Sequence, residues 1–206
     1  MKATRGYPRV APLLAVAALV IVMLATAACG TPTSATTTKT YTSKDYGYTF
    51  LYPKDWQVAD QTSVGDTAGG TSVSEIGVLD PAGATAGSEL IDTAIVSIYK
   101  LNATIVASMM PDVRKEVETV LASIESQQSD IKTLNALSEI TINGMSGFKV
   151  TYSLTKSGTP ITSTMYFLFS GNIEYQVTVQ AADPNWGKDK PIFDAMMASF
   201  QPGPSK

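Results

Sequence analysis

Apolar and polar residues alternate along most of this chain with the period of two that is typical of β-strands. The alternation predicts strands at residues 48–52, 73–79, 94–101, 137–142, 148–154, 167–169 and 173–179. Residues 156–158 and 171–172 place a glycine next to Ser or Asn, which favours tight hairpin turns. The strands after residue 137 are therefore expected to form an antiparallel meander.

The period changes to that of a helix in two segments. Pro111 suits the first turn of a helix, and the residues after it place one apolar stripe at helical spacing: Val113, Val117, Val120, Leu121 and Ile124. A second helix is predicted to start near Pro191, with an inner face of Ile192, Phe193, Met196, Met197 and Phe200. Strands, a helix, a meander and a second helix predict an α+β fold in which an antiparallel β-sheet is flanked by helices.

The first 29 residues have the pattern of a bacterial export signal. Lys2, Arg5 and Arg9 precede an apolar run at residues 11–24, which is too short to remain as a transmembrane helix, and small residues lead to Cys29. The pattern resembles the lipoprotein signal, in which this Cys is acylated and becomes the first mature residue. We therefore expect a signal peptide at residues 1–28 and a lipid anchor on Cys29.

Composition divides the rest of the chain into three parts. Residues 29–40 comprise the lipidated Cys and a Thr/Ser-rich tether without apolar periodicity. Residues 41–201 show no internal repeat and no second linker, and their length suits a single domain. Residues 202–206 are expected to form a disordered tail.

Charge and cysteine content limit the kinds of partner that are expected. Cys29 is the only cysteine, so no disulfide can form within the chain, and acylation accounts for a lone thiol in an exported protein. The signal peptide holds three of the 15 basic residues and none of the 18 acidic ones, which leaves the mature part with a net charge of −6. Without a cluster of basic residues, nucleic acid is not an expected partner. An acyl chain, and not a basic surface, would hold the protein on the outer face of the bacterial cytoplasmic membrane.

Three short motifs resemble one protein family. Residues 46–56 (YGYTFLYPKDW) resemble the opening of PsbP-like proteins, residues 142–150 (INGMSGFKV) a strand pair of that family, and residues 197–200 (MASF) its closing helix. The resemblance implies the α/β/α sandwich that PsbP-like proteins share with Mog proteins, with Trp56 in the core. Bacterial surface lipoproteins of the LpqN type belong to the same family. Its members share a fold more than a function, so the resemblance implies little about activity.

The sequence offers little that is typical of an enzyme. The chain has no His, the usual general base and a common zinc ligand, and an acylated Cys29 leaves no thiol nucleophile. Residues 97–100 (SIYK), 156–158 (KSG) and 170–172 (SGN) match the three signatures of penicillin-recognising enzymes. Ser97 and Lys100, however, lie on a predicted strand, where residues three apart point to opposite faces. We expect no catalytic residues, no cofactor and no enzymatic activity.

Acidic residues offer the only candidate metal ligands. Asp60 and Asp66 in one loop, or Asp80, Glu89 and Asp92 in the next, could meet around a calcium ion. They lack the regular alternate spacing of a loop built to hold calcium. We therefore expect these groups to be solvated loop charges and expect no metal site.

The sequence favours a non-catalytic envelope lipoprotein whose extracytoplasmic domain binds a protein or an envelope component. The alternative is a carrier or sensor of an apolar ligand held between sheet and helix, in a pocket lined by Tyr99, Tyr166, Phe167, Met196 and Met197. Trp186 lies in a predicted loop at residues 183–187, where it either fills the core or forms a partner contact.

Overall fold

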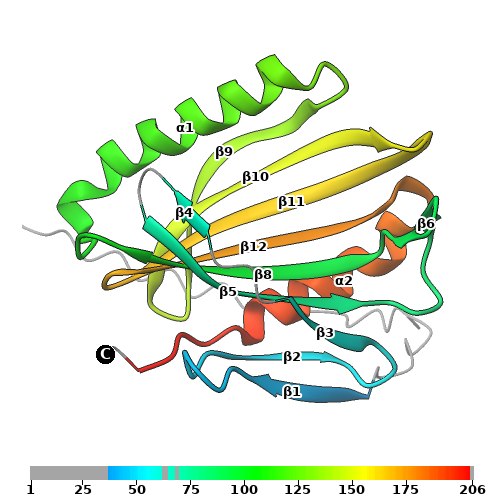
Figure 1. Ribbon diagram of the computed structural model, residues 1–206, viewed down its shortest axis with the longest axis horizontal. Helices are drawn as coiled ribbons and strands as arrows, with labels where there is room; N and C mark the ends of the chain where they lie inside the picture. The colour runs from blue at the N-terminus through cyan, green and yellow to red at the C-terminus, as the bar shows by residue number, and fades with distance from the viewer. Residues whose placement is uncertain (1–36, 62–64, 68–69, 205–206) are drawn as a thin grey trace, which may run out of the picture. The chain divides into compact units, whose positions relative to one another are not determined.

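An eight-stranded antiparallel sheet lies at the centre of the fold (Figure 1). This computed structural model describes residues 37–61, 65–67 and 70–204, so the predicted signal peptide and Cys29 lie outside the described residues. The strands lie in the order β3–β5–β8–β12–β11–β10–β9, and β4 pairs with β5. Their bounds are β3 Gln57–Gln61, β4 Gly65–Thr67, β5 Gly70–Leu79, β8 Thr93–Leu101, β9 Lys132–Ile142, β10 Met145–Lys156, β11 Thr159–Ser170 and β12 Ile173–Ala182.

Strands β9 to β12 form the predicted meander because each connection between them is a two-residue turn. Asn143 and Gly144 have φ of 47° and 84°, and Ser157 and Gly158 have φ of 49° and 79°. Two successive residues with positive φ are what a type I′ turn requires, and this turn matches the twist of the strands that it joins. The turn residues therefore set the register of the long hairpins.

One face of the sheet packs against helix α2 (Asp183–Ser199) and against the hairpin of β1 (Thr38–Thr42) and β2 (Thr49–Pro53). The segment after α2 joins this layer, because Thr49 and Gln201 exchange two backbone hydrogen bonds of 2.8 and 3.0 Å. The main core lies between the two layers and includes Tyr48, Phe50, Trp56, Val96, Ile98, Tyr175, Val177, Phe193, Met196, Met197 and Phe200. The predicted inner face of the second helix and the buried position of Trp56 are confirmed.

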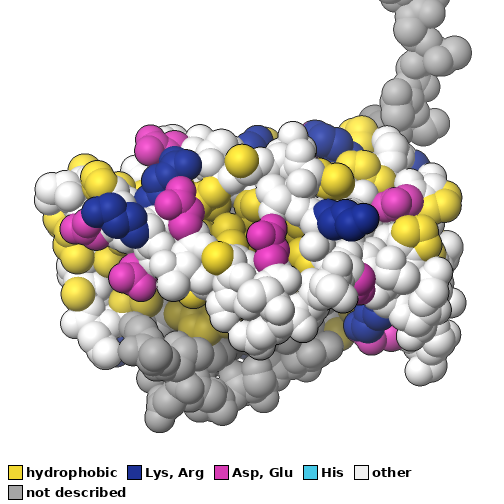
Figure 2. All heavy atoms as spheres, turned by 90° about the horizontal axis from the view of Figure 1, so that it is seen from above, with side chains coloured by type: hydrophobic (Ala, Val, Ile, Leu, Met, Phe, Trp, Pro, Cys, Tyr) yellow, Lys and Arg dark blue, Asp and Glu magenta, His cyan; other side chains and the backbone are white. Residues whose placement is uncertain are grey.

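Helix α1 (Met110–Gln127) covers the opposite face of the sheet, over β9, β10 and β11 (Figure 1). It follows a short 3₁₀ helix, η1 (Ala107–Met109). Val117 is buried against Phe148 and Phe167, as the stripe predicts, whereas Val120 at the margin of the stripe is 51% exposed. Figure 2 looks down on this side and shows basic and acidic side chains interspersed over it. Two helical layers on opposite faces of an antiparallel sheet confirm the predicted α+β sandwich.

The predicted boundary between tether and domain at residue 41 is wrong. Residues 38–40 belong to β1, which pairs with β2 over its whole length, and the described residues from 37 onward form one compact unit. Tyr41 packs against the main core, with its ring 5.8 Å from that of Tyr48. The β-branched Thr residues that suggested a tether also suit a paired strand, and the pairing decides between the two.

The predicted loop at residues 183–187 is also wrong, because α2 begins at Asp183, about two turns before the predicted start. Asp183 and Pro184 occupy its first turn, where an acidic side chain and a proline are both favourable. Pro191 lies inside the helix and cannot donate a hydrogen bond to the carbonyl of Gly187. Both residues are exposed, so water can satisfy that carbonyl.

The C-terminal residues are held on the domain as far as residue 204, contrary to the predicted disordered tail. The backbone N–H of Gly203 donates to the hydroxyl of Tyr175 at 3.2 Å, and Pro202 and Gly203 are half-buried. Residues 205–206 lie outside the described residues. Within the described ranges, no helix has both the length and the apolar character needed to cross a membrane.

Candidate functional site

Helix α2 covers β11 and β12 but not the whole sheet, and a cleft of about 500 Å³ lies beside it. One wall of the cleft is α2, and its floor comes from β9, β10 and β11. The charged and aromatic side chains that line it are Lys149, Tyr166, Trp186, Lys190, Phe193 and Asp194. A cleft of this volume can hold a small ligand or a few side chains of a partner.

The floor of the cleft is polar at one point and aromatic at another. The hydroxyls of Thr151 and Thr164 hydrogen bond across β10 and β11 at 2.9 Å. Tyr166 beside them is buried, and burial together with the negative charge of Asp194 raises the pKa of its phenol to about 12. Lys190 forms a 2.6 Å ion pair with Asp194 on the rim. Tyr166 therefore stays protonated at neutral pH and can offer a hydrogen bond.

Trp186 lies in the first half of α2 and not at the tip of a loop. It is half-buried, it packs against Phe193 with ring centroids 6.0 Å apart, and it also lines the cleft. Trp186 can therefore have both predicted roles at once, as a core residue and as a surface contact.

A second cleft of about 500 Å³ lies near the C-terminal segment and is lined by Lys44, Asp45, Tyr46, Lys100, Tyr175 and other residues. It has two aromatic rings where the cleft beside α2 has three. Aromatic anchors favour binding, so the cleft beside α2 is the stronger candidate.

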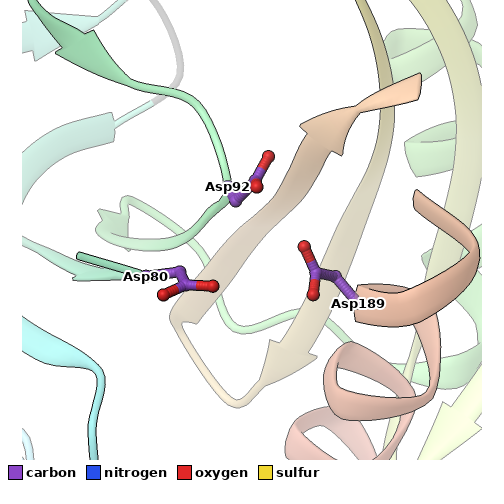
Figure 3. Close-up of side chains that lie close together, drawn as sticks. All are labelled: Asp80, Asp92 and Asp189. Carbon is purple, nitrogen blue, oxygen red and sulfur yellow. The ribbon is translucent and has the colours of Figure 1, made fainter. Parts of the chain in front are cut away.

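Three buried aspartates meet beside the N-terminal half of α2. Asp80 follows β5, Asp92 precedes β8, and Asp189 lies on α2; one carboxylate oxygen from each lies within 4.8 Å of the others. The three side chains reach this point from three separate segments (Figure 3). Asp80 is 5% exposed, and Asp92 and Asp189 are not exposed at all.

The loop from Asp80 to Asp92 is folded back on itself by the short strands β6 (Thr85–Ala86) and β7 (Glu89–Leu90). The backbone N–H of Asp80 donates to the carbonyl of Asp92 at 3.0 Å, which brings the two ends of the loop together. Gly83 lies against Asp92, where a Cβ atom would come within 2.8 Å of the Cβ of that Asp. A glycine is therefore needed for the loop to wrap over the carboxylates.

The three carboxylates differ in how well they are hydrogen-bonded. Asp92 accepts from the backbone N–H groups of Ala84 and Ala182, both at 2.9 Å, and from the amide of Asn185 at 2.6 Å. Asp80 accepts from the N–H of Ala82 at 2.9 Å. Asp189 accepts no hydrogen bond at either oxygen, although both are buried.

Lys188 is the cation nearest to this cluster among the described residues. Its Nζ lies 3.5 Å from an oxygen of Asp80 and 3.5 Å from an oxygen of Asp189, and 64% of its side chain is exposed. Burial would lower the pKa of Lys188, but Asp189 and Asp80 raise it overall. The pKa of Asp189 is raised by burial and by the charges of Asp92 and Asp80, against the opposing effect of Lys188.

Comparison with known proteins identifies the family. The model of the family described as "PsbP-like protein" matches residues 27–201, which is most of the chain. The chain belongs to the PsbP-like family. No significant match is found among curated proteins.

Three solved structures are similar to this PsbP-like chain at low sequence identity. The solution structure of cyanobacterial PsbP from Synechocystis sp. PCC 6803 is 17% identical, with a TM-score of 0.54 over 84% of this chain and 96% of that one. A Pseudomonas aeruginosa protein of unknown function is 16% identical, with a TM-score of 0.48 over 82% and 99% of the two chains. LpqN of Mycobacterium tuberculosis, described as involved in cell envelope biogenesis, is 13% identical, with a TM-score of 0.47 over 82% and 91%. The likeness to the cyanobacterial protein is one of fold.

The penicillin-type signatures do not come together in this PsbP-like domain. Ser97 is buried on β8, and Lys100, three residues further along the strand, is exposed. The other two signatures lie at opposite ends of β11, a strand of 12 residues, and are therefore roughly 40 Å apart. The prediction that Ser97 and Lys100 lie on a strand is confirmed.

The residues predicted to line an apolar pocket are also separated. Tyr166 lines the cleft, whereas Met196 and Met197 are buried in the main core and Phe167 packs under α1 on the other face of the sheet. Tyr99 lies on β8 in register with Glu174 of β12. An apolar pocket made of these five side chains is therefore not formed.

The sequence offered two groups of acidic residues as candidate calcium ligands, and the fold brings part of one group together. Asp80 and Asp92 meet, whereas Glu89 is exposed and forms a 2.6 Å ion pair with Lys156. The side chains of Asp60 and Asp66 lie outside the described residues. Asp189, which completes the cluster, was missed because no sequence spacing relates a helix residue to a loop about a hundred residues earlier.

Proposed function

We propose that this chain is a lipid-anchored protein of the bacterial cell envelope, whose PsbP-like domain binds a protein or an envelope component without catalysing a reaction. The pattern of residues 1–29 supports export and acylation of Cys29. An acyl anchor of two or more chains holds a protein stably, so the domain would act at the outer face of the cytoplasmic membrane.

The observation that carries the binding function is the composition of the cleft beside α2. Its aromatic side chains, Tyr166, Trp186 and Phe193, lie among the charged groups Lys149, Lys190 and Asp194. Aromatic residues in a partly desolvated pocket, surrounded by polar ones, are typical of contact sites that carry much of the binding energy. The exposed amino group of Lys149 adds a charge that a partner can recognise.

The same composition supports binding over catalysis. The chain contains no His, and in the cleft the acid Asp194 is ion-paired with Lys190. The phenol of Tyr166 has its pKa raised to about 12, so it is not poised to act as a base at neutral pH.

Site-specific photo-crosslinking in cells tests the proposal. A photoreactive amino acid is introduced in place of Ser138, an exposed cleft residue on β9, and in a second strain in place of Glu116, an exposed residue of α1 on the other side of the sheet. We expect a discrete crosslinked species from position 138 and not from position 116.

Charge reversal makes the test specific to the cleft. Lys149→Glu and Lys190→Glu change exposed side chains, so the fold should be retained while the crosslink at position 138 weakens. A crosslink that is equally strong in both variants, or equal at positions 138 and 116, would refute binding in this cleft.

A further inference from the structure

We propose that Asp80, Asp92 and Asp189 form a calcium-binding site that joins the loop of residues 80–92 to the N-terminal half of α2. The site stands on its own geometry and does not depend on the proposed function. Oxygen atoms from the three side chains lie within 4.8 Å of one another, and the side chains reach one point from three segments (Figure 3).

The strongest indication of a cation site is that the carboxylate of Asp189 is buried without hydrogen bonds. The residue is not exposed to solvent, and neither of its carboxylate oxygens accepts a hydrogen bond. Both other carboxylates of the cluster accept backbone N–H groups, so the local backbone satisfies Asp80 and Asp92 but not Asp189. A buried, charged carboxylate without such bonds is strongly unfavourable unless a cation is beside it.

Lys188 does not neutralise the cluster. One ammonium group faces three carboxyl groups, so two negative charges are left in a buried place when all three are ionised. Its contacts with Asp80 and Asp189 are long, 3.5 Å each, and its side chain is 64% exposed. Lys188 can therefore turn outward to solvent when a divalent cation enters, and the cation would balance the two remaining charges.

The ligand set selects a hard cation of calcium size. All three ligands are carboxylates, and oxygen ligands suit Ca²⁺ and Mg²⁺, whereas nitrogen and sulfur ligands suit zinc and copper. Ca²⁺ bonds oxygen at about 2.3–2.6 Å and tolerates irregular geometry, whereas Mg²⁺ requires about 2.0–2.1 Å and a near-ideal octahedron. Oxygen atoms spread over as much as 4.8 Å are therefore better matched to Ca²⁺.

Calcium at this point would act on the cleft through α2. Asp92 already joins the loop to the start of the helix through Ala182 and Asn185, and Asp189 would add a bond one turn further along. Trp186 and Lys190, which line the cleft, flank Asp189 on the same helix. We therefore expect bound calcium to stabilise the helical wall of the cleft.

Direct titration of the purified full chain in detergent tests the proposal. After treatment with a chelator, isothermal titration with CaCl₂ should show one saturable site per chain, with a Kd of roughly 10⁻⁴–10⁻³ M, the range of extracellular calcium modules. The midpoint of thermal unfolding should rise with Ca²⁺, and MgCl₂ should bind at least about tenfold more weakly. No saturable binding of Ca²⁺ up to about 10 mM would refute the site.

Two substitutions locate the site. Asp189→Asn keeps the size of the side chain and removes a buried charge whose oxygens accept no hydrogen bond, so the variant should fold without calcium and lose the calcium-dependent rise in the midpoint. Asp194→Asn, an exposed position on the same helix with the same change in charge, is the matched control and should retain the rise. Calcium binding that persists in Asp189→Asn would place any bound ion elsewhere.

A third variant separates calcium binding from a purely internal ion pair. In Lys188→Gln the competing positive charge is lost, so Ca²⁺ should bind at least about tenfold more tightly, the lower bound being the effect in water of one unit charge roughly 5 Å from a divalent ion. If Lys188 is instead the permanent counter-ion of the cluster, the variant will be less stable by the same amount in Ca²⁺ and in chelator, and the proposal is refuted.

Discussion

The ring of Phe200 lies almost parallel to the ring of Tyr48, with centroids 5.6 Å apart and an angle of 15° between the planes. Phe200 follows the last turn of α2 and Tyr48 precedes β2, so the contact joins the two elements that cover this face of the sheet. Tyr175 of β12 meets both rings edge-on, at 5.5 and 5.8 Å. The end of the helix is thereby fixed to the sheet and to the hairpin at once.

Phe200→Ala should destabilise the domain strongly. The side chain is 1% exposed, and deleting a buried aromatic ring lowers the free energy of unfolding by about 3–5 kcal/mol. Urea denaturation followed by far-UV circular dichroism measures the loss. Val120→Ala, at a position of α1 that is 51% exposed, serves as the control and should change the free energy by less than about 0.5 kcal/mol.

Glu174 should make stability fall as the pH rises. Burial raises the pKa of this half-buried carboxyl from 4.5 to about 7, so the folded chain holds the proton more tightly than the unfolded chain does. The stabilisation is complete below about pH 4.5 and is lost as the pH rises to about 7, a change of roughly 2–3 kcal/mol.

Glu174→Gln isolates this contribution from that of other acids such as Asp189. Urea denaturation at several pH values should show a smaller decrease between pH 4.5 and 7 in the variant than in the wild type. Glu116→Gln, at an exposed site on α1, should keep the wild-type profile. Parallel profiles for wild type and Glu174→Gln would show that the carboxyl is not protonated in the folded chain.

The parts of the fold that were predicted correctly are those set by neighbouring residues. The meander follows from alternation within each strand and from turn pairs such as Asn143 and Gly144, which dictate their own geometry. The start of α2 was missed because Pro184 and Pro191 carry the same local signal for a first turn. The packing of Trp186 on Phe193 extends the helix back to Asp183, and that contact is not visible in a local pattern.

The candidate sites were less predictable than the fold. Lys188 and Asp80 are 108 positions apart, and they meet because α2 returns across the end of β5. The cleft beside α2 likewise exists because the helix packs on β11 and β12 and leaves parts of β10 and β9 uncovered, which is a property of packing. Asp80 and Asp92 were candidates because they are close in sequence, whereas Asp189 had no such signal.

The lipid anchor is tested at Cys29. Cys29→Ser removes the acyl acceptor, so the variant should be released or remain unprocessed, while the wild type should fractionate with the membrane. Metabolic labelling with a clickable palmitate, followed by gel fluorescence, should mark the wild type alone. Equal labelling of both proteins would contradict acylation at this residue.

Trp186→Ala is expected to lower the midpoint of unfolding. The half-buried ring packs against Phe193 at 6.0 Å between centroids, and its removal should lower the free energy of unfolding by roughly 1–3 kcal/mol, less than for a fully buried ring. Trp186→Phe keeps an aromatic ring at this position and should lower the free energy of unfolding by less. Photo-crosslinking from position 138 at low temperature, where the Ala variant is folded, measures partner binding separately. We expect the crosslink to weaken but to persist, because Tyr166 and Phe193 still line the cleft; an unchanged midpoint with a lost crosslink would instead make Trp186 a contact residue with no structural role.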